Sequence, residues 1–109
     1  MATSFGIKQG ALNPALEATL KKGDGTAQDL TGATVKFSME HANGKIKVNE
    51  GACTIVDAPT GQVKYSWQTG DTDTPGTYRG EFHVTGLSGG EAIFPSEGYI
   101  TVEVDERVA

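Results

Sequence analysis

The sequence contains only one cysteine, Cys53, and no long apolar run in its 109 residues. A single cysteine cannot close an internal disulfide, which excludes a secreted disulfide scaffold and favours synthesis in a reducing compartment. No stretch approaches the roughly 20 apolar residues of a membrane span, and no signal-peptide pattern is visible at the start. We therefore expect no membrane partner, and we expect Cys53 to be a small buried apolar residue.

Positive charge is scarce as well. Nine lysines and arginines stand against 14 aspartates and glutamates, which gives a net charge of −5, and the basic residues are spread along the chain. Proteins that bind nucleic acid usually present a basic patch or stripe. Nucleic acid is therefore not an expected partner.

Motifs that carry catalytic or metal chemistry are missing. His41 and His83 are the only histidines, and neither has a second ligand at a metal-binding spacing. Asp71 and Asp73 lack the further oxygen ligands of a calcium loop. Ser88 lies in a G-x-S-x-G pattern, but a strand-like segment follows it where a nucleophile elbow needs a helix, so a hairpin turn is the better interpretation. We expect no enzyme, no cofactor and no metal.

Glycine, in contrast, is abundant: 15 residues separate short segments in which apolar and polar side chains alternate. Such alternation predicts strands that each bury one face. Seven or eight short strands at this spacing predict an all-β fold, a two-layer sandwich or a barrel. The expected strands cover residues 16–20, 35–39, 46–48, 53–56, 62–68, 77–84, 91–94 and 99–104.

The alternation also separates an expected core from expected contact residues. The predicted core consists of Val35, Phe37, Val63, Tyr65, Trp67, Tyr78, Phe82, Ile100 and Val102. Residues 1–13 lack clear alternation and are predicted to be an N-terminal arm that orders on a partner, followed by one domain over residues 14–109. The candidate protein contacts are Phe5, Ile7 and Leu12 in the arm, Asp71 and Asp73 in a loop, and Tyr99, which is out of phase with the last strand.

Four strings of residues resemble a known family: LTGATVKFSM at 30–39, DAPTGQVKYSW at 57–67, DTDTPGTYRGEF at 71–82 and FPSEGY at 94–99. They are similar to the immunoglobulin-like domain at the N-terminus of phage baseplate upper proteins and of related phage and prophage virion proteins. This resemblance implies an immunoglobulin-like antiparallel β-sandwich. It also implies that Tyr78 is a tyrosine corner, with its hydroxyl bonded to a nearby backbone group. Gly80 stands where the immunoglobulin cysteine would follow, so the likeness is to disulfide-free members.

The resemblance implies a non-enzymatic attachment module of a tailed-phage virion, in the tail, baseplate, neck or capsid surface. The expected partners are other virion proteins and copies of the chain itself, with synthesis in the host cytoplasm and residence in the virion. The alternative is a carbohydrate-binding or adhesive module that recognises a host glycan. An exposed aromatic residue with convergent polar groups would distinguish that alternative.

Overall fold

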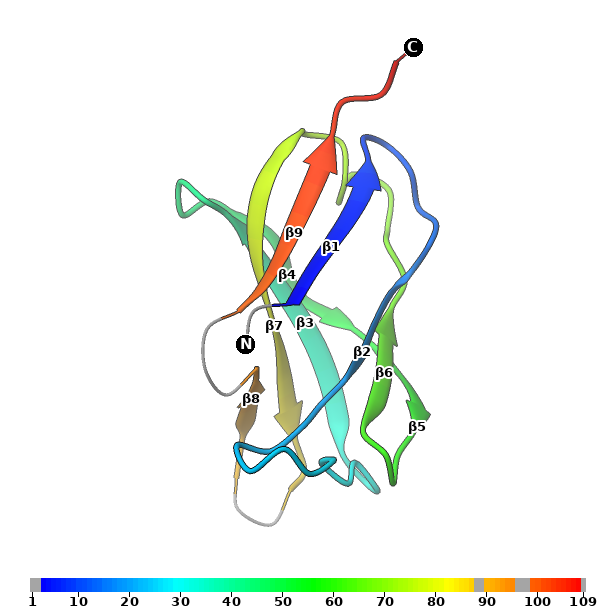
Figure 1. Cartoon of the computed structure of the whole chain (residues 1–109), viewed down its shortest axis with the longest axis vertical. Coiled ribbons are helices and arrows are strands. Elements are labelled where there is room, and N and C mark those ends of the chain that lie inside the picture. Colours follow the sequence, from blue (N-terminus) through cyan, green and yellow to red (C-terminus); the bar gives the residue numbers. More distant parts are fainter. Residues whose placement is uncertain (1–2, 88–89, 96–98, 109) are drawn as a thin grey trace.

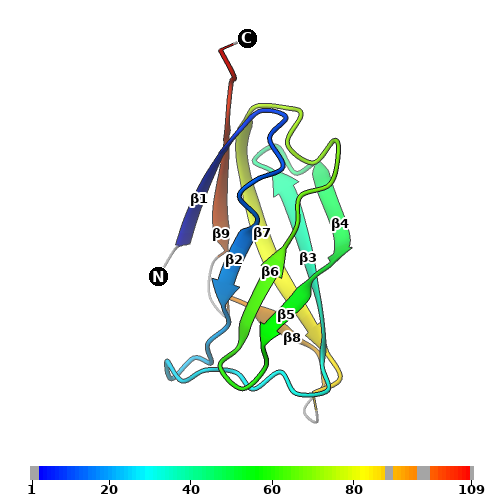
Figure 2. The same ribbon diagram turned by 90° about the vertical axis from the view of Figure 1, so that its right-hand side faces the viewer.

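The computed structural model describes residues 3–87, 90–95 and 99–108. These residues form nine strands arranged in two facing layers (Figures 1 and 2). In chain order the strands are β1 (Thr3–Lys8), β2 (Leu16–Thr19), β3 (Thr34–His41), β4 (Ile46–Ala52), β5 (Thr54–Asp57), β6 (Gln62–Tyr65), β7 (Gly76–Thr85), β8 (Ala92–Phe94) and β9 (Ile100–Asp105). The described part of the chain contains no helix long and apolar enough to cross a membrane.

The strand order is that of an immunoglobulin-like sandwich. The larger sheet runs β1-β9-β7-β3-β4, with β8 also paired to β7, and the smaller sheet runs β2-β6-β5. This arrangement places the counterparts of strands C, F and G in one sheet and those of B, E and D in the other. The predicted all-β sandwich is confirmed, with nine strands where seven or eight were expected. One pair departs from the antiparallel expectation, because β1 runs parallel to β9.

The core lies between the two sheets and is centred on the ring of Phe37. The nine residues predicted to form the core are each 4% exposed or less. The ring of Phe37 lies 5.1 Å from those of Tyr65 and Phe82 and meets Trp67 edge-on at 6.0 Å. A Cβ atom at Gly80 would lie 2.8 Å from the Phe37 ring, so glycine leaves the space that this ring fills. An aromatic cluster thus fills the space beside Gly80, the position where the resemblance places the immunoglobulin cysteine.

The start of the chain differs from the predicted arm. Residues 3–8 form β1, and all six pair in continuous register with β9. Ile7 is buried in the core, and the half-buried Phe5 ring lies 5.8 Å from that of Trp67. The two side chains predicted to contact a partner therefore pack against the chain's own core. The alternation was missed because only two apolar residues carry it and because the pairing strand lies at the other end of the sequence.

The loop before β7 is hydrogen-bonded to the segment that follows β1. The backbone N–H of Gly10 donates to the Thr72 carbonyl at 2.9 Å, and the Thr72 hydroxyl donates to the Ala11 carbonyl at 2.9 Å. Thr72 is 1% exposed, so these bonds form away from water. Because a buried polar group without a partner is costly, the two segments are linked as one unit.

Tyr78, near the start of β7, forms the predicted tyrosine corner. Its hydroxyl donates to the carbonyl of Thr74 at 2.6 Å, and its ring packs edge-on against His41. Burial raises the pKa of the Tyr78 hydroxyl, so the group remains a proton donor at neutral pH. The bond connects the last turn of the loop to the strand that crosses the centre of the large sheet.

Replacing the buried indole, Trp67→Ala, should lower the free energy of unfolding by about 3–5 kcal/mol, because the ring leaves a cavity among three other aromatic residues. Urea denaturation followed by far-UV circular dichroism measures the loss. Val56→Ala removes an exposed aliphatic side chain on β5 and serves as the control. A Trp67→Ala protein that unfolds at the wild-type urea concentration would contradict the assigned core position.

Deleting residues 1–8 should destabilise the sandwich by about 2–4 kcal/mol, because the burial of Ile7 and of half of Phe5 is lost and the edge of β9 is uncovered. Differential scanning calorimetry of the full and shortened chains gives the comparison. An unchanged melting temperature would mean that these residues behave as a separable arm after all.

Tyr78→Phe should cost about 1–2 kcal/mol, since it deletes the bond to Thr74 and keeps the ring. The matched Tyr99→Phe variant removes an exposed hydroxyl, and its stability should stay within about 0.5 kcal/mol of wild type. Thermal melts of the two variants side by side test the difference. Equal losses would show that the corner contributes no special stability.

Candidate functional site

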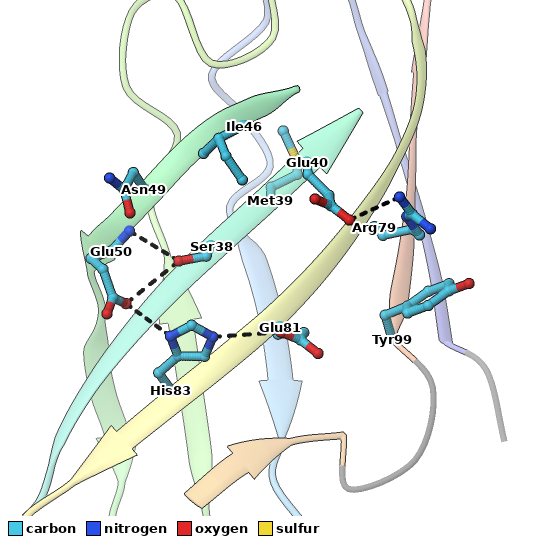
Figure 3. A pocket seen from close by; sticks show the side chains of 10 residues that line it. All are labelled: Ser38, Met39, Glu40, Ile46, Asn49, Glu50, Arg79, Glu81, His83 and Tyr99. Carbon is cyan, nitrogen blue, oxygen red and sulfur yellow. Dashed lines mark hydrogen bonds and ion pairs between the residues drawn. The ribbon is translucent and has the colours of Figure 1, made fainter. Parts of the chain in front are cut away.

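A groove of about 310 Å³ lies on the outer face of the large sheet (Figure 3). It crosses β4, β3 and β7 and ends beside the residue that precedes β9. Its lining residues are Ser38, Met39, Glu40, Ile46, Asn49, Glu50, Arg79, Glu81, His83 and Tyr99. Seven of these ten lining residues have polar or charged side chains, and those seven come from three adjacent strands.

Strand alternation explains why these polar groups share one face. On β3, Phe37 and Met39 are buried, so Ser38 and Glu40 project from the opposite face. On β7, the buried Tyr78, Gly80 and Phe82 leave Arg79, Glu81 and His83 on the outer face. The antiparallel register then places Ser38 opposite Glu81 and Glu40 opposite Arg79. The core packing thus determines which side chains line the groove.

A bulge in β4 brings one more carboxylate onto this face. The pairs Phe37–Gly51 and Met39–Val48 leave two β4 residues opposite Ser38, and the second of them is Glu50. Glu50 has a φ of 55°, the only positive value at a non-glycine position in the described part of the chain. Its N–H donates to the Ser38 hydroxyl oxygen at 3.0 Å. Bulges commonly redirect a side chain next to a functional site, and backbone strain clusters at such sites.

The charged groups of the groove are already paired with one another. Arg79 Nη2 lies 2.8 Å from Glu40 Oε1, and His83 lies between two carboxylates, 3.0 Å from Glu50 and 3.5 Å from Glu81. Three carboxylates thus face one guanidinium and one imidazole, so the groove carries net negative charge when the imidazole is neutral. These pairs are partly exposed and add little stability, but they hold the side chains in place. The negative electrostatic potential of the groove therefore disfavours an anionic ligand.

Tyr99 and Ile46 contribute exposed apolar surface to the groove. The Tyr99 side chain is 43% exposed and Ile46 is 57% exposed. The Arg79 guanidinium lies over the Tyr99 ring, 5.4 Å from its centroid, at a distance typical of a cation–π contact. Because Arg79 is held by Glu40, the ring has a fixed neighbour on that side (Figure 3).

The other candidate contacts lie outside the groove. Leu12 is exposed after β1. Asp73 is exposed and bonded to the Lys47 ammonium and the Thr74 hydroxyl, which together hold its pKa below the usual range. Asp71 is half-buried and accepts hydrogen bonds from the Tyr65 hydroxyl and the Gln68 N–H, the latter at 2.9 Å. The Asp71 carboxylate is therefore hydrogen-bonded within its own part of the chain and is not a free carboxylate.

The remaining chemical candidates give no second site in the described residues. There, no group of three or more histidine, cysteine, aspartate or glutamate side chains is placed to hold a metal ion. Cys53 is half-buried where a buried residue was expected, and burial raises the pKa of its thiol to about 12, so it remains protonated at neutral pH. Ser88 lies outside the described residues.

Sequence reasoning identified part of the groove and missed the rest. Because the predicted strand over residues 77–84 buries Tyr78 and Phe82, its alternation indicates that Arg79, Glu81 and His83 share the polar face, and the phase of Tyr99 indicates exposure. Glu50 was not found, because the bulge that turns it over the sheet has no local sequence signal. The contact between Glu50 on β4 and His83 on β7, which spans the intervening β3, is a tertiary feature that strand patterns do not specify.

Comparison with known proteins gives the family. A search of curated proteins finds no match to this chain. The family model described as the BppU N-terminal domain matches residues 9–106. That match spans every described strand except β1, and it coincides with the immunoglobulin-like order and the tyrosine corner. The chain therefore belongs to the family of phage baseplate upper protein N-terminal domains.

Proposed function

We propose that this phage baseplate-related structural protein joins neighbouring virion proteins and has no enzymatic role. The observation that carries the proposal is the family match over residues 9–106, which covers most of the chain. Because the family takes its name from the baseplate upper protein, the baseplate is the favoured position over the tail tube, neck or capsid surface. Other virion proteins and further copies of the chain are the proposed partners, after synthesis in the host cytoplasm.

The edges of the large sheet support a joining role. β1 and β4 are the outermost strands of its order, and edge strands carry backbone groups that can pair with another chain. The two edges differ, because β4 is interrupted by the bulge at Glu50 whereas β1 pairs over six residues without a register shift. β1 is therefore the more regular edge for strand addition. Repeated copies around a symmetric particle would use the same edge each time.

Quantitative mass spectrometry of gradient-purified particles tests this proposal. The chain should be present in multiple copies and should fractionate with baseplate proteins when particles are separated into heads, tails and baseplates. Amine-reactive cross-linking of intact particles should connect Lys8, at the end of β1, to another virion protein. A chain abundant in infected cells and absent from purified particles would contradict a structural role.

A further inference from the structure

Tyr99 stands apart from the other aromatic residues of the protein. Among the described residues it is the aromatic side chain with the largest exposure, whereas Tyr65, Trp67, Tyr78, Phe82 and Phe94 are all buried in the core. An exposed ring offers an apolar face on which the C–H groups of a ligand can pack. Arg79 covers the ring on one side and is itself fixed by Glu40, so the ring is partly ordered before any ligand arrives.

The polar groups beside this ring suit a ligand with several hydroxyl groups. The side chains of Glu50 and Glu81 are 45% and 43% exposed, and each contacts His83 through one oxygen. A carboxylate has about four lone-pair positions, so both retain acceptor capacity for ligand hydroxyls. Asn49, which also lines the groove, has an amide that can donate or accept. The set combines one stacking surface with planar polar side chains on adjacent strands.

Charge narrows the class of ligand further. Three carboxylates disfavour an anionic ligand, and the one arginine of the groove is already paired with Glu40. A cationic ligand is disfavoured at the ring itself, because the Arg79 guanidinium already lies over Tyr99. A neutral ligand avoids both the repulsion from the carboxylates and the repulsion from the Arg79 guanidinium. The groove volume of about 310 Å³ is at the lower end of the usual range for ligand sites, which suits a small ligand.

From these observations we propose that the groove on the large sheet binds a neutral pyranose residue of a saccharide. The sugar packs its C–H face on Tyr99 and donates hydroxyl hydrogen bonds to Glu81 and Glu50. The bulge at Glu50 has a role in this arrangement, since it brings this carboxylate onto the groove face, where it contacts His83 (Figure 3). The site lies on the face of the sheet, whereas the proposed joining contact uses the backbone edge of β1; Tyr99 precedes β9, the strand that pairs with β1.

The test begins with the intact chain on an array that carries neutral oligosaccharides, sialylated and sulfated oligosaccharides, and amino sugars. We expect binding to be confined to neutral structures. The best neutral sugar is then titrated to about 10 mM in a ¹H–¹⁵N NMR experiment, a range that detects even millimolar affinity. Shifts should concentrate on the amides of Arg79, Glu81 and Tyr99.

Variants at the ring separate stacking from general disruption. Tyr99→Ala should weaken binding by about tenfold, which corresponds to about 1.4 kcal/mol, while Tyr99→Phe should stay within about twofold of wild type. Glu81→Gln should also weaken binding, because a neutral amide is a poorer acceptor. Val56→Ala, an exposed aliphatic change on β5, should have no effect. Melting temperatures of all four variants confirm that each is folded.

Three results would overturn the saccharide site. They are preferential binding of anionic glycans, the absence of any shift at the groove amides with every neutral sugar tested, and unchanged affinity in Tyr99→Ala. None of these measurements uses the virion, and groove variants are expected to enter particles normally. The saccharide site and the joining role can therefore fail independently of each other.

Discussion

The packing of Phe37 between the two sheets is the constraint on which the rest of the structure depends. The ring is fully buried, and it fits because Gly80 on the neighbouring strand has no side chain. Because side chains alternate between the two faces of a strand, burying Phe37 and its contacts places the adjacent residues on the opposite face. Ser38 and Glu40 on β3 and the charged residues of β7 therefore face outward. The same packing that fills the core beside Gly80 thus produces the polar face of the groove.

Much of this arrangement can be predicted from sequence because strand alternation is a local signal. The segments around β3, β7 and β9 showed regular alternation, and their inward residues could be assigned without knowing any partner strand. The tyrosine corner at Tyr78 was expected from the family resemblance, and the structure shows its hydroxyl bonded to a backbone carbonyl four residues away. The family resemblance came from the strings at residues 30–39, 57–67, 71–82 and 94–99, which include β6 and much of β3 and β7.

The features that sequence did not predict all depend on contacts between distant residues. β1 has two inward apolar residues, Phe5 and Ile7, and acquires its register from β9, more than 90 positions along the chain. The β6 alternation continued to Gln68, yet the strand ends at Tyr65 and Trp67 is buried beyond it. The position of Glu50 depends on an extra residue in β4, which pairs irregularly with β3. Pairing partners, strand ends and bulges are tertiary properties, so a one-dimensional pattern leaves them open.

The two proposed roles use different parts of the same sheet, and the geometry makes them compatible. Backbone pairing at an edge recruits N–H and C=O groups in the plane of the sheet, whereas a ligand on the face contacts side chains that stand perpendicular to it. β1 lies at one end of the strand order and the groove crosses β7, β3 and β4 towards the other. A partner strand added beside β1 extends the sheet in its own plane, and β1 and β9 lie between it and the β7 residues of the groove. The face therefore remains accessible in an assembled particle if the joining contact is made at that edge.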